Sequence, residues 1–461
     1  MHNIGELLPI WSIVPFVGML LSIAIFPLVK NEWWEKNQLK VAIGWSLLFL
    51  IPFCIGFGVD ITIFELEEVV VLDYIPFIIL LLGLFTVAGG IHIAGNIQGT
   101  TKNNVIILLI GTLLASWIGT TGAAMVLIRF LLRANSWRQH RTHIVVFFIF
   151  LVANIGGCLT PLGDPPLFLG YLRGVPFFWT LGHIWPLLLI NTVVLLAVFV
   201  VIDRRMMKKE DSFALERLEI DAKAAKRIPL KIEGKRNIIF LAMIIIAVIL
   251  NGLIPQTAMF INPETGLTYG IDINEGIHLG LEYFVQIGII LIAMVLSLKL
   301  TPGKVRDDNE FEWGPIAEVA KLFIGIFITM IPALAILRAH GGDLGIDSPL
   351  GFFWCTGLLS SFLDNSPTYV VFLTTAGSLG MDGVGAIATS AGTVVPEILL
   401  AISAGAVFMG AMTYIGNAPN FMVKNIAEKS KVKMPSFFGY MGWSCAILLP
   451  LFVIDTVLFF L

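Results

Sequence analysis

The chain has 461 residues, of which 57% are hydrophobic and 13% are charged, and its formal net charge is -3. Soluble domains carry about 25% charged residues, so this composition excludes an ordinary soluble fold and predicts a membrane protein with many helices. The small net charge gives no indication of a nucleic-acid partner, and we expect none.

The first half of the chain contains apolar stretches that are long enough to cross a hydrocarbon core of about 30 Å. A further apolar segment, 103–133, could either cross the membrane or turn back inside it. No basic stretch precedes the first apolar stretch and no small-residue cleavage site follows it, so we expect a retained span rather than a signal peptide. The predicted spans lie near 9–29, 38–58, 72–97, 142–172 and 183–203.

A segment rich in lysine and arginine, 204–236, follows the first half and is predicted to be a cytoplasmic linker. The overlapping stretch 203–227 could form an amphipathic helix on the inner leaflet or a solvated connector. Beyond the linker the apolar pattern returns, and 349–376 again could cross or turn back. The predicted spans of the second half lie near 237–254, 281–300, 315–338, 392–426 and 437–460.

Three motifs occur twice, in the same order and about half a chain apart. This order predicts two repeats, 1–203 and 237–461, joined by the linker 204–236. SWIGTTG (116–122) corresponds to SFLDNSP (361–367), TPLGDPP (160–166) to TYIGNAP (413–419), and VAGGIHIAG (87–95) to RAHGGDLG (338–345).

The distribution of basic residues predicts the topology, because cytoplasmic loops of membrane proteins are enriched in lysine and arginine. If 103–133 and 349–376 are hairpins and the N-terminus is outside, only Arg173 and Arg338 of all basic residues lie outside. The acidic stretches 65–73 and 264–275 then also lie outside. If both segments cross instead, the basic cluster between Arg129 and Arg141 lies on the outer face. The hairpin arrangement is therefore favoured.

An odd number of spans in each repeat inverts the second repeat relative to the first, as in many secondary transporters. We therefore predict an all-α polytopic membrane protein. Each of its two inverted repeats contains about five transmembrane helices and one reentrant hairpin, with unwound helices at the midplane. The expected location is the inner membrane of the cell, with many spans and the N-terminus outside.

Two of the repeated motifs contain residues that interrupt a helix. Gly163, Pro165 and Pro166 surround Asp164, and TYIGNAP places glycine and proline around Asn417 in the same way. A proline kink that only shapes packing is the simpler alternative. Unwound backbone at membrane depth persists only where it is buried in protein or lines a polar cavity, so two symmetric breaks indicate a binding site.

The hairpin tips and the two breaks are predicted to converge at mid-depth, where they form a negatively charged site without lysine or arginine. That charge favours a cation, and a carboxylate at bilayer depth is a functional hypothesis by default. Asp164, Asp364 and Asn365 are the candidate ligands of a transported sodium ion. The full set of predicted site residues is Thr120, Thr121, Thr160, Gly163, Asp164, Asp364, Asn365, Ser366, Thr413 and Asn417.

The motifs GDPP and FLDN, with their partners GNAPN and GTTG, resemble those of the ion transporter superfamily. Within it the chain is similar to NhaD-type sodium/proton antiporters and to related citrate and arsenite carriers. The resemblance implies a homodimer in which a transport domain moves like an elevator against a scaffold. It also implies that Asp164 and the Asp364-Asn365 pair bind ions. Dicarboxylate carriers use Ser-Asn-Thr hairpin tips, and this chain departs from that pattern at Gly119–Thr121 and Asp364–Ser366.

These features predict a secondary active transporter, with sodium/proton antiport as the leading hypothesis. The alternative is sodium- or proton-coupled transport of citrate or another organic anion, and a third possibility is a channel or a membrane scaffold. We expect no enzymatic activity and no bound cofactor, with sodium ions and protons as transported species. The expected partners are the lipid bilayer, a second copy of the chain, a small inorganic cation and, in the alternative, a carboxylate.

Overall fold

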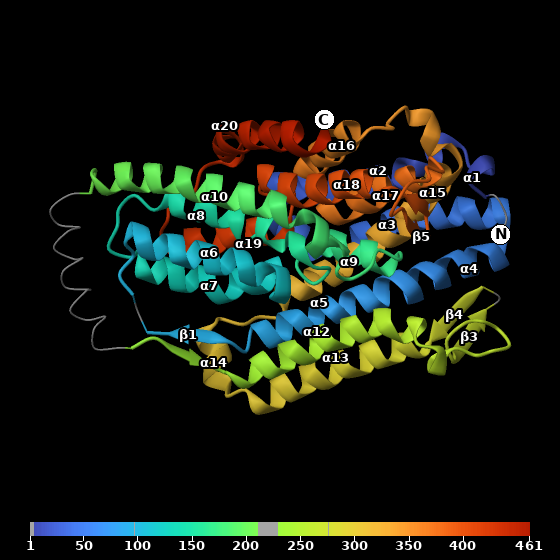
Figure 1. The fold of residues 1–461 in the computed structure, drawn as a ribbon, viewed down its shortest axis with the longest axis horizontal. Coiled ribbons are helices and arrows are strands. Elements are labelled where there is room, and N and C mark those ends of the chain that lie inside the picture. The colour runs from blue at the N-terminus through green and yellow to red at the C-terminus, as the bar shows by residue number, and fades with distance from the viewer. Residues whose placement is uncertain (1–3, 96, 211–228, 275) are drawn as a thin grey trace.

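A computed structural model describes residues 4–95, 97–210, 229–274 and 276–461 and shows an elongated bundle of helices (Figure 1). Most of the stretch 203–227, for which an amphipathic helix or a connector is predicted, lies outside the described residues. Short helices and 3-10 turns extend the longer helices at several ends. They are α1 (Ile4–Leu7), α14 (Gly303–Asp308) and the turns Ile10–Ile13, Ile254–Gln256, Ala258–Phe260 and Gly341–Leu344.

Within the described residues, 10 helical segments are long and apolar enough to cross a membrane. This finding confirms the prediction of a polytopic helical membrane protein. One of the segments, Thr101–Ile118, belongs to a stretch predicted to turn back, and the others overlap predicted spans. The long helices without a break are α2 (Val14–Val29), α3 (Asn31–Phe57), α10 (Trp179–Met207), α12 (Arg236–Leu253), α13 (Leu281–Leu300), α15 (Gly314–His340) and α20 (Phe437–Asp455), and α4 (Val59–Glu67) and α5 (Ile75–Ala88) together form one further span.

The third span begins earlier than the sequence predicts. Instead of 72–97, one continuous helical segment runs over Val59–Ala88, with a π-helical stretch at Glu68–Tyr74 between α4 and α5. The acidic residues that suggest a loop therefore lie on a helix. One of them, Asp73, forms an ion pair with Arg173 at 2.8 Å. This ion pair offsets the charge of Asp73, the last acid of the stretch.

Two predicted spans are interrupted near their middles. In both, the helical hydrogen-bond ladder opens where glycine and proline occur, as predicted around Asp164 and Asn417. The stretch 142–172 consists of α8 (Thr142–Leu151), a 3-10 turn (Ile155–Leu159) and α9 (Pro165–Leu172). The stretch 392–426 consists of α18 (Pro396–Met409), a 3-10 turn (Gly410–Met412) and α19 (Ala418–Lys429).

Two helix pairs turn back on themselves. α6 (Thr101–Ile118) and α7 (Thr120–Ala134) are joined at Gly119, whose φ of 79° suits a residue without a side chain. Figure 1 shows α6 and α7 returning toward the same end of the bundle. α16 (Pro349–Phe362) and α17 (Asn365–Ser378) form the second pair. The tips of both pairs carry the repeated motifs.

The fold also contains three small antiparallel sheets, which the all-α prediction does not include. They lie in connections between helices, where backbone groups without a helical partner hydrogen bond to each other. β1 falls within the motif VAGGIHIAG, whose second copy forms a 3-10 turn instead, so these two copies differ in structure. The pairs are β1 (His92–Ala94) with β2 (Lys231–Glu233), β3 (Gly270–Asn274) with β4 (Ile277–Gly280), and β5 (Ile387–Thr389) with β6 (Gly392–Val394).

Helix α8 lies in the centre of the protein. Of the segment Thr142–Leu159, 89% of the residues are buried, against 22% of the most apolar window within Leu281–Leu300. Such a low value is expected for a helix that faces lipid. The fold therefore surrounds the first broken helix with protein on nearly all sides.

The connections gather at two opposite ends of the bundle (Figure 1). The ends of the linker, β1 and α14 lie at one end, and the N-terminus with β3, β4 and β5 lies at the other. This arrangement separates the connections predicted to be cytoplasmic from those predicted to be outside. The orientation itself remains a prediction.

Candidate ion-binding site

Asp164 is the centre of a hydrogen-bond cluster that joins the two halves of the chain. Its Oδ1 accepts hydrogen bonds from the Thr120 hydroxyl and the Asn417 amide, both at 3.1 Å, and its Oδ2 accepts one from the Asn365 amide at 2.7 Å. None of these four side chains, which we call the Asp164 cluster, is more than 2% exposed. The structure therefore brings together four of the predicted site residues from four separate segments.

Asp164 and Asn417 occupy equivalent places in the two broken helices. Asp164 has extended backbone (φ -142°, ψ 139°) immediately before α9, and Asn417 has nearly the same conformation (φ -151°, ψ 137°) before α19. Prolines in the first turn of both helices prevent the helix from extending backwards. Neither side chain caps its own helix, so both are available to reach across to the other half.

The Asn417 amide has a crowded set of acceptors. Its Nδ2 lies 3.1 Å from Asp164 Oδ1, 3.2 Å from the Ala153 carbonyl oxygen and 3.3 Å from Asn154 Oδ1. Two of these acceptors belong to the unwound end of α8. The second broken helix is thus held directly against the first at the position of the buried acid.

Thr160 and Thr413 connect the hairpin tips to the breaks. The Thr160 hydroxyl donates to the Ser116 carbonyl near the end of α6, and the Thr413 hydroxyl donates to the Ser361 carbonyl near the end of α16. Each hydroxyl also accepts a backbone N–H from two residues further on, at 3.2 Å. Both hydroxyls therefore donate and accept within the frame of the site and hold each hairpin tip to its break; their role in ion binding stays a prediction.

Gly163 allows the first break to close tightly on the hairpin tip. Its carbonyl accepts the Thr120 backbone N–H at 2.8 Å. A Cβ atom at Gly163 would lie 2.1 Å from the Gly157 carbonyl oxygen, and one at Gly416 would lie 2.6 Å from the Gly410 carbonyl oxygen. Both contacts are far shorter than a carbon and an oxygen tolerate, so the two breaks share a requirement for glycine.

Asp364 lies at the tip of the second hairpin but outside the Asp164 cluster. Its carboxylate accepts the Ser366 backbone N–H at 2.9 Å and thereby caps α17. The Ser366 hydroxyl donates to Asn365 Oδ1 at 3.3 Å. Among the described residues no hydrogen bond joins the two acids. Asn365, which follows Asp364 in the chain, donates to Asp164 instead. Thr121, the remaining predicted residue, is half-buried beside Thr120.

Two asparagines outside the predicted site residues complete the network. The Asn154 amide donates to Asn420 Oδ1 at 2.7 Å, and the Asn420 amide donates to the carbonyls of Gly410 and Thr413 at 2.8 and 2.9 Å. Both asparagines are 0% exposed. Asn420 ends the motif GNAPN, and Asn154 is a lone polar residue in a long apolar run, which is the signal that could have identified it.

Helix N-termini surround the site, and each carries roughly half a positive charge. α7, α9, α17 and α19 all begin at the residues described above. No lysine or arginine in the described part of the chain hydrogen bonds to the Asp164 cluster. The first turns of three of these helices contain prolines, which have no backbone N–H to donate. They are Pro165, Pro166, Pro367 and Pro419. The helix ends therefore favour a buried carboxylate while offering few N–H donors to an anionic ligand.

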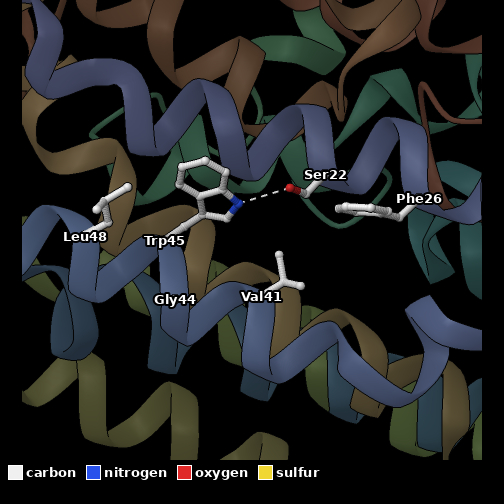
Figure 2. Close-up of a pocket in the computed structure, with 6 residues that line it drawn as sticks. All are labelled: Ser22, Phe26, Val41, Gly44, Trp45 and Leu48. Carbon is white, nitrogen blue, oxygen red and sulfur yellow. Dashed lines mark hydrogen bonds between the residues drawn. The ribbon is translucent and has the colours of Figure 1, made fainter.

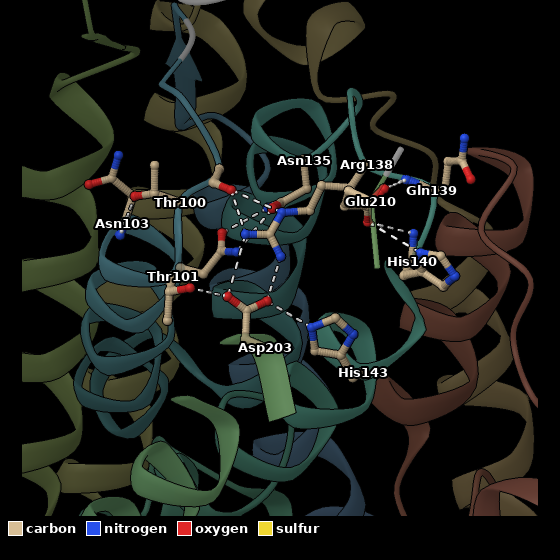
Figure 3. A network of polar contacts seen from close by, with 12 residues as sticks. Thr100, Thr101, Asn103, Asn135, Arg138, Gln139, His140, His143, Asp203 and Glu210 are labelled. Carbon is tan, nitrogen blue, oxygen red and sulfur yellow. Dashed lines mark hydrogen bonds and ion pairs between the residues drawn. The ribbon is translucent and has the colours of Figure 1, made fainter. Parts of the chain in front are cut away.

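A second buried network lies at the base of the α6–α7 hairpin (Figure 3). Asp203, near the end of α10, pairs with the Arg138 guanidinium, accepts the Thr101 hydroxyl at 2.5 Å and lies 2.7 Å from His143 Nε2. Arg138 also donates to the Gly99 carbonyl at 2.7 and 3.0 Å. Because buried charges require such partners, this network fixes the hairpin base to α10.

An open groove between α2 and α3 is separate from the site. The Trp45 indole N–H donates to the Ser22 hydroxyl at 3.0 Å, so most of the lining that remains is carbon (Figure 2). None of the lining residues belongs to the predicted site, and we expect lipid chains to fill the groove. The lining residues are Ser22, Phe26, Val41, Gly44, Trp45 and Leu48.

Comparisons with known proteins identify the family. A family model described as "Putative citrate transport" (CitMHS_2) matches residues 5–460, which include both hairpins and both broken helices. A search of the curated proteins finds no match. The family match confirms the resemblance to citrate transporters that the repeated motifs indicate. The chain belongs to the citrate transport family.

Proposed function

We propose that the protein is a secondary active transporter that exchanges sodium ions for protons. The observation that carries this proposal is the buried Asp164 carboxylate, which has three neutral hydrogen-bond donors and, among the described residues, no basic partner. At membrane depth such a group is costly unless it binds a proton, pairs with a cation or faces water. A proton and a sodium ion are thus alternative ligands of one carboxylate, and this competition couples their movement.

Alternating access would follow from the charge of the site. The carboxylate is neutralised when either cation is bound and charged when both are absent. Moving the empty, charged site across an apolar barrier costs more than moving the loaded site. The protein therefore exchanges the two cations without leaking either of them.

The proposal includes the predicted architecture of two inverted repeats, 1–203 and 237–461, with reentrant hairpins and an elevator-like movement. Its support is the pairing of contacts: Thr160 and Thr413 bind the hairpin tips in the same way, and Gly163 and Gly416 make equivalent close approaches. The homodimer and the location in the inner membrane are further parts of the proposal. They rest on the resemblance and on the distribution of charge.

A second candidate function is coupled transport of citrate or a similar organic anion. It is favoured by the description of the family and by the N-terminus of α7, which has no proline and presents Thr120 and Thr121. In that case the cation bound at Asp164 would drive the anion. The geometry favours this candidate less, because prolines occupy the other helix starts and no basic side chain among the described residues hydrogen bonds to the Asp164 cluster.

A transport assay separates the two candidates. The full-length protein is reconstituted in vesicles containing a pH-sensitive dye, and sodium, lithium, potassium and citrate are added separately. Antiport predicts a pH change with sodium alone, which is lost in Asp364→Asn or Asp164→Asn. Citrate uptake without any cation exchange in the absence of citrate would support the second candidate. Asp364→Asn tests the negative charge of Asp364 separately from its role as the cap of α17, because asparagine also caps helices well.

Thr120→Val should raise the sodium concentration needed for half-maximal exchange by roughly tenfold. The hydroxyl donates to the Asp164 carboxylate, and a hydrogen bond to a charged group contributes about 1.5–3 kcal/mol. Without it the ionised carboxylate is less stable, so protons compete better with sodium. Thr121→Val is the matched control, since Thr121 is half-buried and lies outside the Asp164 cluster. Equal effects of both substitutions would contradict the assignment.

A further inference from the structure

A second acid lies inside the membrane-spanning part of the protein. Asp455 is the last residue of α20, within the candidate span Phe437–Phe460, and it is 0% exposed. It is far along the sequence from every motif of the Asp164 cluster. A π-helical turn, Thr456–Phe460, follows it directly, and such turns occur frequently at functional sites.

Asn191, in the middle of α10, is the hydrogen-bond partner of this acid. Its Nδ2 lies 2.9 Å from both carboxyl oxygens of Asp455 and also 2.9 Å from the Leu187 carbonyl oxygen. Asn191 is 0% exposed as well, and its Oδ1 has no hydrogen-bond partner. The Asn191 amide is therefore the donor to both oxygens of the Asp455 carboxyl group, while the buried Asn191 Oδ1 accepts no hydrogen bond.

The neighbouring elements provide no counter-charge within contact distance. The elements packed against α20 and the turn after it are mainly α10, α16 and the 3-10 turn Gly410–Met412. On α10 the nearest titratable groups are His183 and Asp203, about 12 and 18 Å along the helix axis from Asn191. α16 carries Cys355, and α20 itself carries Tyr440 and Cys445. Within the described part of the chain, Asp455 forms no ion pair.

One proton would neutralise the buried Asp455 carboxylate and also provide a donor for Asn191 Oδ1. An ionised carboxylate in this position would be buried with a single neutral donor, which is strongly unfavourable. A proton on one carboxyl oxygen removes the charge and supplies an O–H donor for the Asn191 Oδ1 that lacks a partner. Metal cations that bind oxygen collect several ligands and are best held by more than one charged group, whereas Asp455 is the one carboxylate among the described residues of α10, α16 and α20 that contacts Asn191.

We propose that Asp455 is a second proton-binding site of this protein, separate from Asp164, at which the carboxylic acid pairs with the Asn191 amide. The proton adds an O–H hydrogen bond from Asp455 of α20 to Asn191 of α10, and this acid–amide pair connects the two helices. A contact links the pair to the second hairpin, because the Trp354 indole of α16 donates to the Thr456 hydroxyl at 3.0 Å. The proposal is independent of the transported species, since it concerns the protonation of one side chain.

Infrared spectroscopy of the full-length protein in detergent tests this site without any transport measurement. At neutral pH an exposed aspartate is ionised, so carboxylic-acid C=O bands report only protonated, shielded acids. The unchanged protein should show one such band that the Asp455→Asn variant lacks, so the difference between the two spectra contains that band. A difference spectrum that shows only carboxylate bands would overturn the proposal.

Two further variants make the assignment secure. Asn191→Leu should shift the acid band to higher frequency, because the C=O and O–H groups lose their amide partner; an unshifted band would show that the acid and the amide are not paired. This variant also serves if Asp455→Asn does not fold. Asp164→Asn is the matched control, and it should leave the Asp455 band in place. Loss of that band in Asp164→Asn would show that the two acids are not separate sites.

Discussion

Sodium/proton exchange should fall at least about 100-fold when Asp164 is replaced by asparagine. The substitution keeps the size of the side chain but removes the carboxylate on which three donors of the Asp164 cluster converge. An amide neither takes up a proton nor neutralises a sodium ion at neutral pH, so the variant lacks the charge on which the proposed exchange depends; a 100-fold loss corresponds to about 2.8 kcal/mol. The measurement is the initial rate of the dye signal after sodium is added to reconstituted vesicles.

Restoring the charge from the other half of the chain provides the matched comparison. The double variant Asp164→Asn with Asn417→Asp moves the carboxylate to the equivalent break, where the two side chains are 3.1 Å apart. We expect this variant to recover only a small part of the lost exchange: the cluster again contains one acid, but the new carboxylate faces the Ala153 carbonyl oxygen and Asn154 Oδ1, to which the Asn417 amide otherwise donates. If Asp164→Asn alone retains exchange, Asp164 is not the coupling group and the proposed function is wrong.

Gly163→Ala should destabilise the protein by about 1–3 kcal/mol, which is typical of an overpacked interior. The new methyl carbon would lie 2.1 Å from the Gly157 carbonyl oxygen and 2.9 Å from the Ser116 Cα, so the break and the hairpin tip must separate. Gly416→Ala should have a similar effect, because its Cβ would lie 2.6 Å from the Gly410 carbonyl oxygen. The thermal unfolding midpoint in detergent measures both.

Two other glycines serve as controls for this prediction. Gly44 in α3 and Gly182 in α10 are helical, and an added Cβ at either would have no atom within 4 Å. Alanine at these positions should leave the unfolding midpoint unchanged or raise it slightly, since alanine favours a helix over glycine. A Gly163→Ala variant as stable as these controls would show that the close approach at the break is not required.

The breaks and their partners could be predicted from sequence because the signals there are chemical and local. Glycine and proline stop a helix wherever they occur together, and the repeated order of motifs indicates which breaks belong together. This reasoning selects Thr120, Asp164, Asn365 and Asn417, which the structure then joins in one cluster. Side chains that meet only through the tertiary fold carry no such local signal.

The errors have the same origin. The helix over Val59–Ala88 contains an acidic stretch, and the ion pair between Asp73 and Arg173, which offsets one of its charges, joins residues far apart in sequence. The cap that Asp364 forms on α17 is not among the predictions, because it depends on the turn between α16 and α17, which composition alone does not determine; the role of Asp364 as an ion ligand stays a prediction. Asn154 has no polar counterpart in the second half, so a search for repeated motifs does not find it.

The crowded amide of Asn417 has a consequence for how fast an ion could bind. An amide group has two hydrogens, whereas three acceptors lie within 3.3 Å of Asn417 Nδ2. At any moment one of the three oxygens therefore receives no hydrogen from Asn417, and if that oxygen is Asp164 Oδ1 it still accepts the Thr120 hydroxyl. Under the proposed function, a small cation would coordinate that oxygen without breaking an Asn417 hydrogen bond, and the two amide hydrogens would redistribute over the remaining acceptors by a small rotation. Binding and release would then require little rearrangement of the protein, which favours rapid turnover.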